Sequence, residues 1–521
     1  MSRKTIRNDC IAIYGAEKKC LKTLLRSVDK ISLTTDMWRS NHQVVEYMVI
    51  TGHFIDVEWK LQKRVLSFVK VLAPRHGVDV ADVIFKCLKS WGVDEKVFSI
   101  SVDDASYNDS CLKTLKGNIS CDSRLVLDDA LFHVRCCAHI LNLLVQDDLK
   151  EIKDVIYNIR ESVKYINHND SRLKNFCDVV EQKHLKERKL VIDCTTRWNS
   201  TFDMLPCALK FKTIFASYKD KEPHYNYAPS NEDYDKVEKV CRLLHVFNLV
   251  NHVISGSEYP TANLYLAKVA RVKDVIDKAS DDENHFMREM VVPMKIKFDK
   301  YWGDCNLLMA IASVLDPRCK FQMINVCFPL IFKTEEVSIT NMNKVRTSLQ
   351  QLYCEYSLNM EVTSSNEDNN TTTNPSSSQK PKLVVHSGFQ HWMSKVRENE
   401  AIPPMKFELD AYLDEPVFIP TSEYGDSSFS ALEWWRSNSM KYKVLSKFDA
   451  DILAIPISTV ASEFTFSAEG RVIDKYRSKL NKESIEALIC GGDWLRSKYL
   501  VKKREKEHEI EEDQKEIYFK I

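Results

Sequence analysis

Two strand-like segments of this chain end on an aspartate in the same register, and this pair constrains the fold more than any other feature. The segments span residues 31–36 and 97–103. Side chains alternate between the two faces of a strand. One face of each segment therefore carries two hydroxyls and a final carboxylate: Ser32, Thr34 and Asp36 in the first, Ser99, Ser101 and Asp103 in the second. As parallel neighbours, the two strands would lie about 4.8 Å apart, so that both carboxylates could share a metal ion.

The order of elements around this pair predicts a mixed α/β sheet. Two more strand-like runs span residues 44–55 and 64–71, and apolar positions with helical spacing follow over 80–91. A short strand is expected at 131–135. Three strands, a crossover helix and a further strand favour a mixed sheet. From residue 202 to about 358 the pattern is almost wholly helical, which predicts an all-α part.

The composition is that of a large globular protein whose contacts with nucleic acid must be local. Of 521 residues, 44% are hydrophobic, and 74 basic residues balance 74 acidic ones. Net charge therefore neither supports nor excludes DNA as a partner. We find no signal-peptide core and no apolar run long enough to span a bilayer, and the 16 cysteines lack the spacing of a disulfide framework. We expect an intracellular chain with no membrane partner and with reduced cysteines.

A polar stretch separates the helical part from the C-terminal part. Residues 362–383 contain almost no apolar side chain, so they cannot offset the entropy of folding, and we expect a disordered linker there. Helical periodicity resumes over 407–413 and 428–455. Its apolar stripe, which we interpret as core and dimer contact, consists of Leu432, Trp435, Tyr442, Leu445 and Phe448. The adjacent Trp434 and Trp435 point about 100° apart on a helix, so at most one of them faces any one pocket.

A third carboxylate would complete a metal site built on the two aspartates. The candidate is Glu463, in a segment that reads as a short helix with Ser458 as its N-cap and Gly470 just after its end. Small residues such as Ala461 and Ser462 would let this helix pack closely on a sheet. The sequence thus predicts a site assembled from residues 360 positions apart (463 minus 103).

Five short blocks, taken in order, resemble the hAT superfamily of transposases. The blocks are TTDMW at 34–38, VDDAS at 102–106, RCCAH at 135–139, TRWNS at 196–200 and ASEFTFS at 461–467. The likeness is strongest to the plant ricesleeper and daysleeper group of transposase-derived proteins with zinc-finger BED domains. It covers roughly residues 30 to 497, including the LEWW block at 432–435.

The resemblance implies a ribonuclease-H-like catalytic core that is interrupted by a large helical insertion and followed by a C-terminal dimerisation region. The expected divisions are a helical lead-in (1–27), the first part of the core (28–200), an all-α insertion domain (201–361), the disordered linker (362–383), a connecting helix (384–405), the dimerisation region with the last catalytic helix (406–500) and a charged tail (501–521).

The same resemblance assigns roles to seven residues. The catalytic and metal-binding triad falls on Asp36, Asp103 and Glu463, with Mg²⁺ or Mn²⁺ as the cofactor. The DNA-binding pair that stabilises a flipped base falls on Arg197 and Trp198, and an aromatic face can stack on any base. Cys136 and His139 become supports of the active-site wall. The implied partners are DNA and a second or further copy of the chain, and the implied compartment is the nucleus.

Two departures from the family pattern bear on activity. Members of this kind usually begin with a BED zinc finger, yet no Cys-x₂-Cys or His-x₃₋₅-His pair precedes Asp36, so we expect no zinc in this chain. A basic residue often follows the catalytic glutamate in transposases, whereas Phe464 follows it here. His133, Cys136 and His139 could be misread as a zinc site, but a strand-to-helix junction puts them on different faces.

Three functions remain open at this point. The first is a domesticated or non-autonomous, DNA-binding, dimerising nuclear protein that keeps the acidic triad. The second is an active cut-and-paste transposase that uses two divalent metals. The third is a catalytically inert helical scaffold for protein interactions. Trp198 is equally open, because tryptophan more often buries its ring than presents it to a base.

Overall fold

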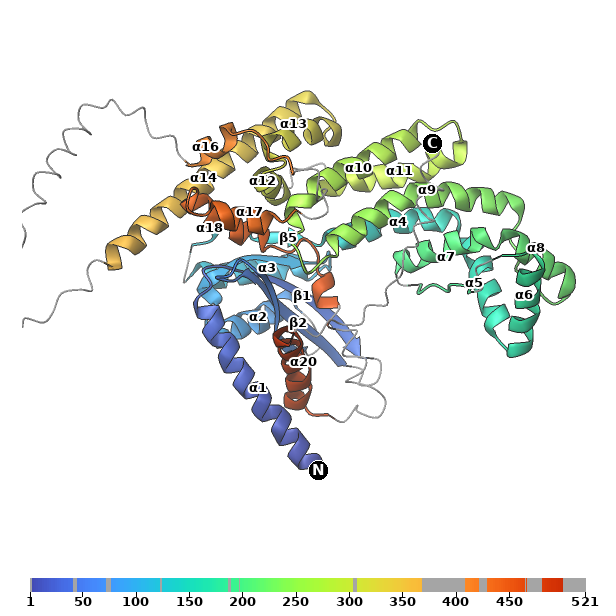
Figure 1. Cartoon of the computed structure of the whole chain (residues 1–521), viewed down its shortest axis with the longest axis horizontal. Helices are drawn as coiled ribbons and strands as arrows, with labels where there is room; N and C mark the ends of the chain where they lie inside the picture. Colours follow the sequence, from blue (N-terminus) through green and yellow to red (C-terminus); the bar gives the residue numbers. More distant parts are fainter. Residues whose placement is uncertain are drawn as a thin grey trace, which may run out of the picture.

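A five-stranded mixed sheet and a large helical body make up the fold (Figure 1). The structure, a computed structural model, describes residues 2–40, 45–71, 76–121, 124–185, 189–195, 197–302, 307–367, 408–420, 429–463, 465 and 480–499. Three sequence predictions fall largely outside these residues: the connecting helix at 384–405, the charged tail at 501–521, and the helix end at Gly470.

The sheet has the strand order β3-β2-β1-β4-β5. Its strands are β1 (Ile31–Ser40), β2 (Val45–Ile55), β3 (Leu61–Val71), β4 (Val97–Val102) and β5 (His133–Arg135). β1 pairs antiparallel with β2, and β2 with β3, whereas β4 runs parallel to both β1 and β5. The mixed sheet predicted from the sequence is confirmed, because the helix that follows β3 carries the chain over to a parallel strand.

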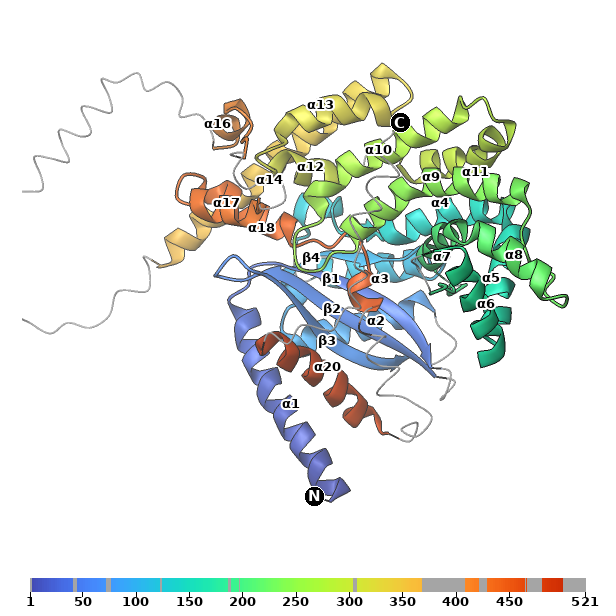
Figure 2. The same cartoon turned by 45° about the vertical axis from the view of Figure 1, so that its right-hand side comes forward.

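Four helices pack with the sheet around one hydrophobic core. They are α1 (Arg3–Arg26), α2 (Gly77–Trp91), α3 (Asn108–Ser120) and α20 (Lys482–Lys498). α2 buries the apolar positions that its spacing predicted and ends at Gly92, whose φ of 70° suits a residue without a β-carbon. α1 lies within the helical lead-in expected at residues 1–27. It lies beside α20, so that the first and last helices of the described chain pack together (Figure 2).

α20 also caps an irregularity in the edge strand. The pairing of β3 with β2 skips Leu66, which leaves backbone groups without a ladder partner. From α20, Asp493 accepts the Val65 N–H at 3.0 Å, and the Trp494 indole donates to the Val65 carbonyl at 2.8 Å. The Trp91 indole donates to the Leu66 carbonyl at 3.0 Å. Side chains of α20 and α2 therefore hydrogen-bond the backbone groups at this bulge.

The helical body shares a second core with the sheet. After β5 come α4 (Cys137–Glu151), α5 (Lys153–Asn167), α6 (Asp170–Gln182), α7 (Trp198–Lys210), α8 (Lys212–Lys221), α9 (Asn231–Ile254), α10 (Ala262–Ser280), α11 (His285–Trp302), α12 (Leu307–Leu315), α13 (Lys320–Ile331) and α14 (Glu335–Glu367). α4 leaves the sheet directly and packs against α9 and α11. The boundary expected at 200/201 thus falls inside a helical body that already begins at α4.

α14 continues to Glu367, six residues into the stretch expected to be a disordered linker. Helix propagation adds one hydrogen bond for each residue fixed, so an established helix can run on through polar residues. The rest of that stretch, from 368 to 383, lies outside the described residues.

The C-terminal helices α16 (Glu408–Asp414), α17 (Ala431–Asn438) and α18 (Lys443–Leu453) return to the same core. Every member of the predicted apolar stripe is buried there. Trp435 is fully buried and its indole donates to the Leu315 carbonyl at 2.9 Å, while Trp434 is only partly buried. The stripe is core, as predicted, but its expected second role as a dimer contact is wrong for this structure, because the chain covers it with its own α12 and α14.

Within the part of the chain that the structure describes, no helix combines the length and the apolar character needed to cross a bilayer.

Candidate metal site

Two neighbouring parallel strands lead to the two aspartates: Asp36 lies on β1, and Asp103 directly follows β4. The paired positions of β1 and β4 include Ser32 with Ser99 and Thr34 with Ser101, and each aspartate lies two residues beyond this last pair. The Ser99 hydroxyl donates to the Ser32 hydroxyl at 3.0 Å, so these positions share one face. The predicted register is confirmed. β1 itself does not end at Asp36, because it continues to Ser40 by pairing with β2.

Both aspartates also hold local hydrogen bonds. Asp36 accepts the backbone N–H of Met37 at 2.7 Å. Asp103 accepts the amide of Asn108 at 2.7 Å and the backbone N–H of Ala105 at 3.3 Å, which places it at the start of α3. These hydrogen bonds direct each carboxylate toward N–H groups of its own segment.

Asp104 points to a different partner from Asp103, as expected for successive residues. Its carboxylate pairs with Arg135 on β5 at 3.3 Å. Asp104 thus has an ion-pair partner of its own on a neighbouring strand.

Glu463 arrives on a segment that returns to the sheet after the helical body. We call residues 456–463 the return segment (Figure 2, the short orange helix beside β1 and β2, with the residues just before it). The Ser101 hydroxyl donates to the Pro456 carbonyl at 2.5 Å, and the Cys137 N–H donates to the Ile457 carbonyl at 2.9 Å. The return segment is thereby tied to β4 and to the start of α4.

The second half of the return segment is a single helical turn. The Thr459 carbonyl accepts the N–H groups of Ser462 and Glu463 at 2.8 and 3.1 Å. Thr459 therefore precedes the turn, and the expected N-cap at Ser458 is wrong by one residue. The Ser458 hydroxyl instead donates to the carbonyl of Ile254 at 2.9 Å, at the end of α9.

The Cys136 side chain anchors the start of this helical turn. Its buried sulfur accepts both the N–H and the hydroxyl of Thr459 at 3.3 Å. The role expected for Cys136 as a support of the site wall agrees with this contact. His139 lies partly buried on α4, and its backbone N–H also reaches the Cys136 sulfur. His133 is exposed on β5 while Cys136 is buried, so the two do not share a face.

Asp36 interacts electrostatically with the other two carboxylates. The pKa of the Asp36 carboxyl is raised to about 7, mainly by burial and further by the charges of Glu463 and Asp103, against a lowering by the Met37 N–H. Among the described residues, no three His, Cys, Asp or Glu side chains converge closely enough to hold a metal ion as they stand. Asp103 and Glu463 thus both lie within electrostatic range of Asp36, while the carboxylates of Asp36 and Asp103 are turned to local N–H groups.

Sequence reasoning missed the buried polar residues beneath the turn. Thr51 and His53 on β2 face Thr34 and Ser462, and all four are buried. Burial lowers the pKa of His53 to about 3, with a smaller effect from Lys63, so its ring is neutral. Their signal was present in the sequence: Thr51 and His53 are polar residues two apart in the largely apolar run from Met48 to Ile55.

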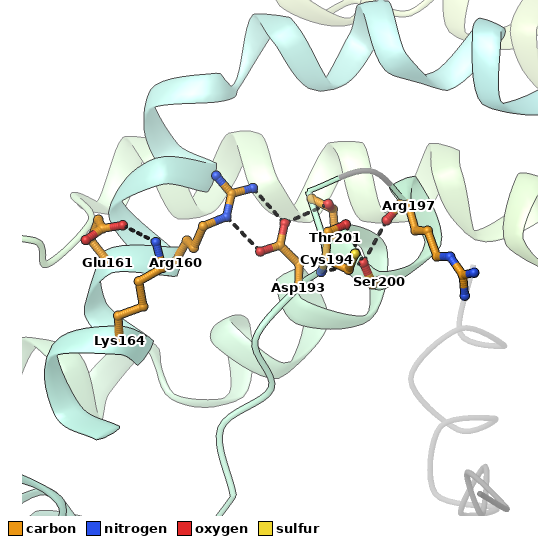
Figure 3. Close-up of polar contacts among 8 residues, drawn as sticks. All are labelled: Arg160, Glu161, Lys164, Asp193, Cys194, Arg197, Ser200 and Thr201. Atoms are coloured by element: carbon orange, nitrogen blue, oxygen red, sulfur yellow. Dashed lines mark hydrogen bonds and ion pairs between the residues drawn. The ribbon is translucent and has the colours of Figure 1, made fainter. Parts of the chain in front are cut away.

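Arg197 and Trp198 lie at the start of α7 and differ in exposure. The Trp198 ring is only 5% exposed and packs against Phe202 in the core, so the structure shows the packing alternative. The Arg197 side chain is exposed and points away from the polar cluster beside it (Figure 3). In that cluster Arg160 donates twice to Asp193, at 2.7 and 2.6 Å, and anchors the approach to α7.

Comparison with known proteins gives the chain its family. It is 34% identical to the zinc finger BED domain-containing protein RICESLEEPER 2 of Oryza sativa, over 94% of this chain and 69% of that protein. It is 33% identical to the putative AC transposase of Zea mays, over 95% of this chain and 60% of that protein. DAYSLEEPER of Arabidopsis thaliana is 31% identical over 95% of this chain and 68% of its own length. The chain belongs to the hAT transposase family.

Family models match this hAT chain in four stretches. They are the ZBED1 RNase-like domain (34–131), the ZBED1 RNase-like helical domain (134–243), the hAT-like transposase RNase-H fold (263–356) and the hAT family C-terminal dimerisation region (408–495). The first covers most of the sheet. The third covers residues that are helical here, from α10 to α14, so the strands of the hAT core precede it in the chain.

Proposed function

We propose that this hAT chain is a transposase-derived, DNA-binding, dimerising nuclear protein that retains Asp36, Asp103 and Glu463 as a site for Mg²⁺ or Mn²⁺. The observation that carries the proposal is the return segment, which brings Glu463 from the far side of the helical body to the aspartate pair. The charges of Glu463 and Asp103 both help to raise the pKa of the Asp36 carboxyl, beside the larger effect of burial. Repulsion among partly buried carboxylates of this kind is relieved by a divalent cation.

The donor set fits such a cation. Carboxylate oxygens are the ligands that Mg²⁺ and Mn²⁺ prefer. Asp36, Asp103 and Glu463 would hold the ion after turning from their local N–H groups toward one another. When bound, the cation would activate the attacking oxygen and stabilise the leaving oxygen in phosphoryl transfer. The chain itself would keep the three carboxylates near the carboxyl ends of β1 and β4.

Mn²⁺ binding to the purified chain tests the site directly. Asp36→Asn keeps the shape of the side chain and removes its charge, so binding should fall by at least tenfold. Asp104→Asn is the matched control, because Asp104 is the next acid after Asp103 and pairs with Arg135 instead. Wild type and Asp104→Asn should bind alike. A wild type that binds no Mn²⁺, or an Asp36→Asn chain that binds as well as wild type, would reject the site.

Binding of DNA would depend on local contacts, since the chain carries no net charge. Arg197 is exposed at the first turn of α7, where the backbone N–H groups also favour a phosphate. Fluorescence anisotropy with labelled duplex DNA at several salt concentrations measures this contact. Failure of the wild type to bind DNA would favour the scaffold alternative.

Dimerisation would use surfaces other than the buried stripe. The matched dimerisation region exposes a few large apolar side chains near its start, Phe418, Ile419 and Met440, the last two by 78% and 82%. Large apolar residues on a surface are suited to contact with a second copy. Light scattering should give a dimer or a larger assembly for the wild type and a smaller mass for Ile419→Asp. A wild type that is monomeric at micromolar concentration would contradict this part.

An active transposase is the second candidate, favoured by two relatives from Zea mays named as putative transposases, at 33% and 32% identity. Its test is metal-dependent cleavage and hairpin formation on terminal-repeat DNA of the family type. Cleavage by the wild type and its loss in Asp36→Asn would establish the enzyme. Mn²⁺ binding and DNA binding without cleavage would leave the domesticated protein as the answer.

A further inference from the structure

A chain of hydrogen bonds runs beneath Glu463 from one strand to the return segment. The His53 ring nitrogen Nε2 lies 3.0 Å from the Thr34 hydroxyl, and that hydroxyl lies 2.8 Å from the Ser462 hydroxyl. The three residues come from β2, β1 and the return segment. All are buried, with His53 at 5% exposed and the other two at zero. We call these three side chains the buried relay.

The buried relay holds together only when the helical turn sits in one place. Thr34 bridges the other two groups, and Ser462 has one further contact, with Thr51 at 3.4 Å. If the turn moved away, the Thr34 hydroxyl would lose its contact with Ser462 in a water-free position, which is unfavourable. Apolar side chains in the same space would stabilise several positions of the turn about equally. The hydrogen bonds of the buried relay instead stabilise one position of the turn.

The relay also fixes the rotation of the turn. Successive residues on a helix point about 100° apart, so a directional bond at Ser462 determines where Glu463 points. His53 is neutral, and its Nε2 either accepts from Thr34 or donates to it. In both cases the Thr34 hydroxyl donates one hydrogen bond and accepts the other, so that it is bonded to both neighbours.

We propose that Thr34 and His53 are positioning residues that orient Glu463 toward Asp36 and Asp103 through Ser462. This inference rests on the proposed metal site for its functional meaning. The geometric claim itself is separate, because the turn should lose its fixed place on the sheet when the relay is broken, with or without a cation.

Amide hydrogen exchange over the return segment tests the geometric claim in the metal-free full-length chain. Thr34→Val removes the hydroxyl and keeps the branched shape, and it should speed exchange of the 457–463 amides at least fivefold. Thr34→Ser keeps the hydroxyl and should restore slow exchange. Ser99→Ala is the matched control, since Ser99 is a buried hydroxyl on the same face that bonds to Ser32. It should leave the return segment unchanged. Unchanged exchange in Thr34→Val would overturn the proposal.

Mn²⁺ affinity then tests the functional claim. Thr34→Val and His53→Leu should weaken binding about tenfold, while Thr34→Ser and Ser99→Ala should bind as wild type does. If Thr34→Val fails to fold, Ser462→Ala breaks the same bond from the other side. Faster exchange together with wild-type affinity would overturn the role toward the metal. Absence of Mn²⁺ binding by the wild type would reject the metal site itself and the functional role with it, while the exchange data would still decide the geometry.

Discussion

Replacement of Asp36 by asparagine should stabilise the folded chain at neutral pH, although it removes a proposed ligand. The pKa of the Asp36 carboxyl rises from 3.8 to about 7 in the folded chain, first through burial and then through Glu463 and Asp103. The unfolded chain therefore releases this proton at lower pH than the folded chain does. Stability is lost as pH rises from about 4 through about 7, and the loss is complete above the folded pKa.

The size of the effect follows from the two pKa values. Their difference corresponds to about 4 kcal/mol once both states are ionised, and to about 1.5 kcal/mol near pH 5. For a chain of this length, about 4 kcal/mol raises the thermal midpoint by about 4 °C. Asp36→Asn cannot ionise, so it should avoid this loss.

Thermal unfolding in the presence of a chelator, at about pH 5 and about pH 8, measures the difference. The gain of Asp36→Asn over wild type should be larger at the higher pH, and Asp104→Asn should show no such gain. Addition of Mn²⁺ should raise the midpoint of wild type and leave that of Asp36→Asn unchanged. An equal gain at both pH values would refute the reasoning, because it would trace the effect to packing rather than to charge.

Three further outcomes are expected. Asp193→Asn should lower the stability of the helical body by about 3 kcal/mol, since it leaves Arg160 without its bidentate partner; urea unfolding followed by helical circular dichroism measures this. Arg197→Ala should weaken DNA binding and reduce the salt slope by about one while leaving the thermal midpoint unchanged, because its side chain is exposed. Trp494→Phe should lower the free energy of unfolding by about 2 kcal/mol, because the buried Val65 carbonyl loses the indole donor; urea unfolding measures this.

The sheet and its acidic pair could be predicted because alternation along a strand is a local property. Ser32 and Ser99 were expected on one face, and their hydroxyls meet there. The order of strands and helix favoured a mixed sheet, but the sequence pattern gave the two strands as parallel neighbours only as a condition. The third acid was a candidate because it lies in a predicted short helix with small residues, and the resemblance to a family then assigned it to the triad. No local pattern connects residue 463 with residue 36.

Features that depend on distant partners could not be predicted in the same way. The first half of α1 leaves Ile6 and Ile13 about half exposed, so burial does not mark its apolar positions. Ser458 was expected to cap the next turn, but its hydroxyl meets the end of α9 instead. Trp435 carries no sign in the sequence that α12 supplies the carbonyl for its indole. Each of these outcomes depends on a partner far away in the chain.

The hydroxyl-lined face of β1 and β4 has a consequence for synthesis on the ribosome. The last sheet strand ends at residue 135 and Glu463 follows 328 residues later (463 minus 135). At about 5–20 residues per second, roughly 15–65 s pass between the synthesis of this strand and that of Glu463, and until then the return segment cannot cover the face. Serine and threonine can hydrogen-bond to water during this interval, whereas valine or leucine would attract other nascent chains. The same side chains that later hold the cover thus give this face hydroxyls that water can solvate while the chain emerges.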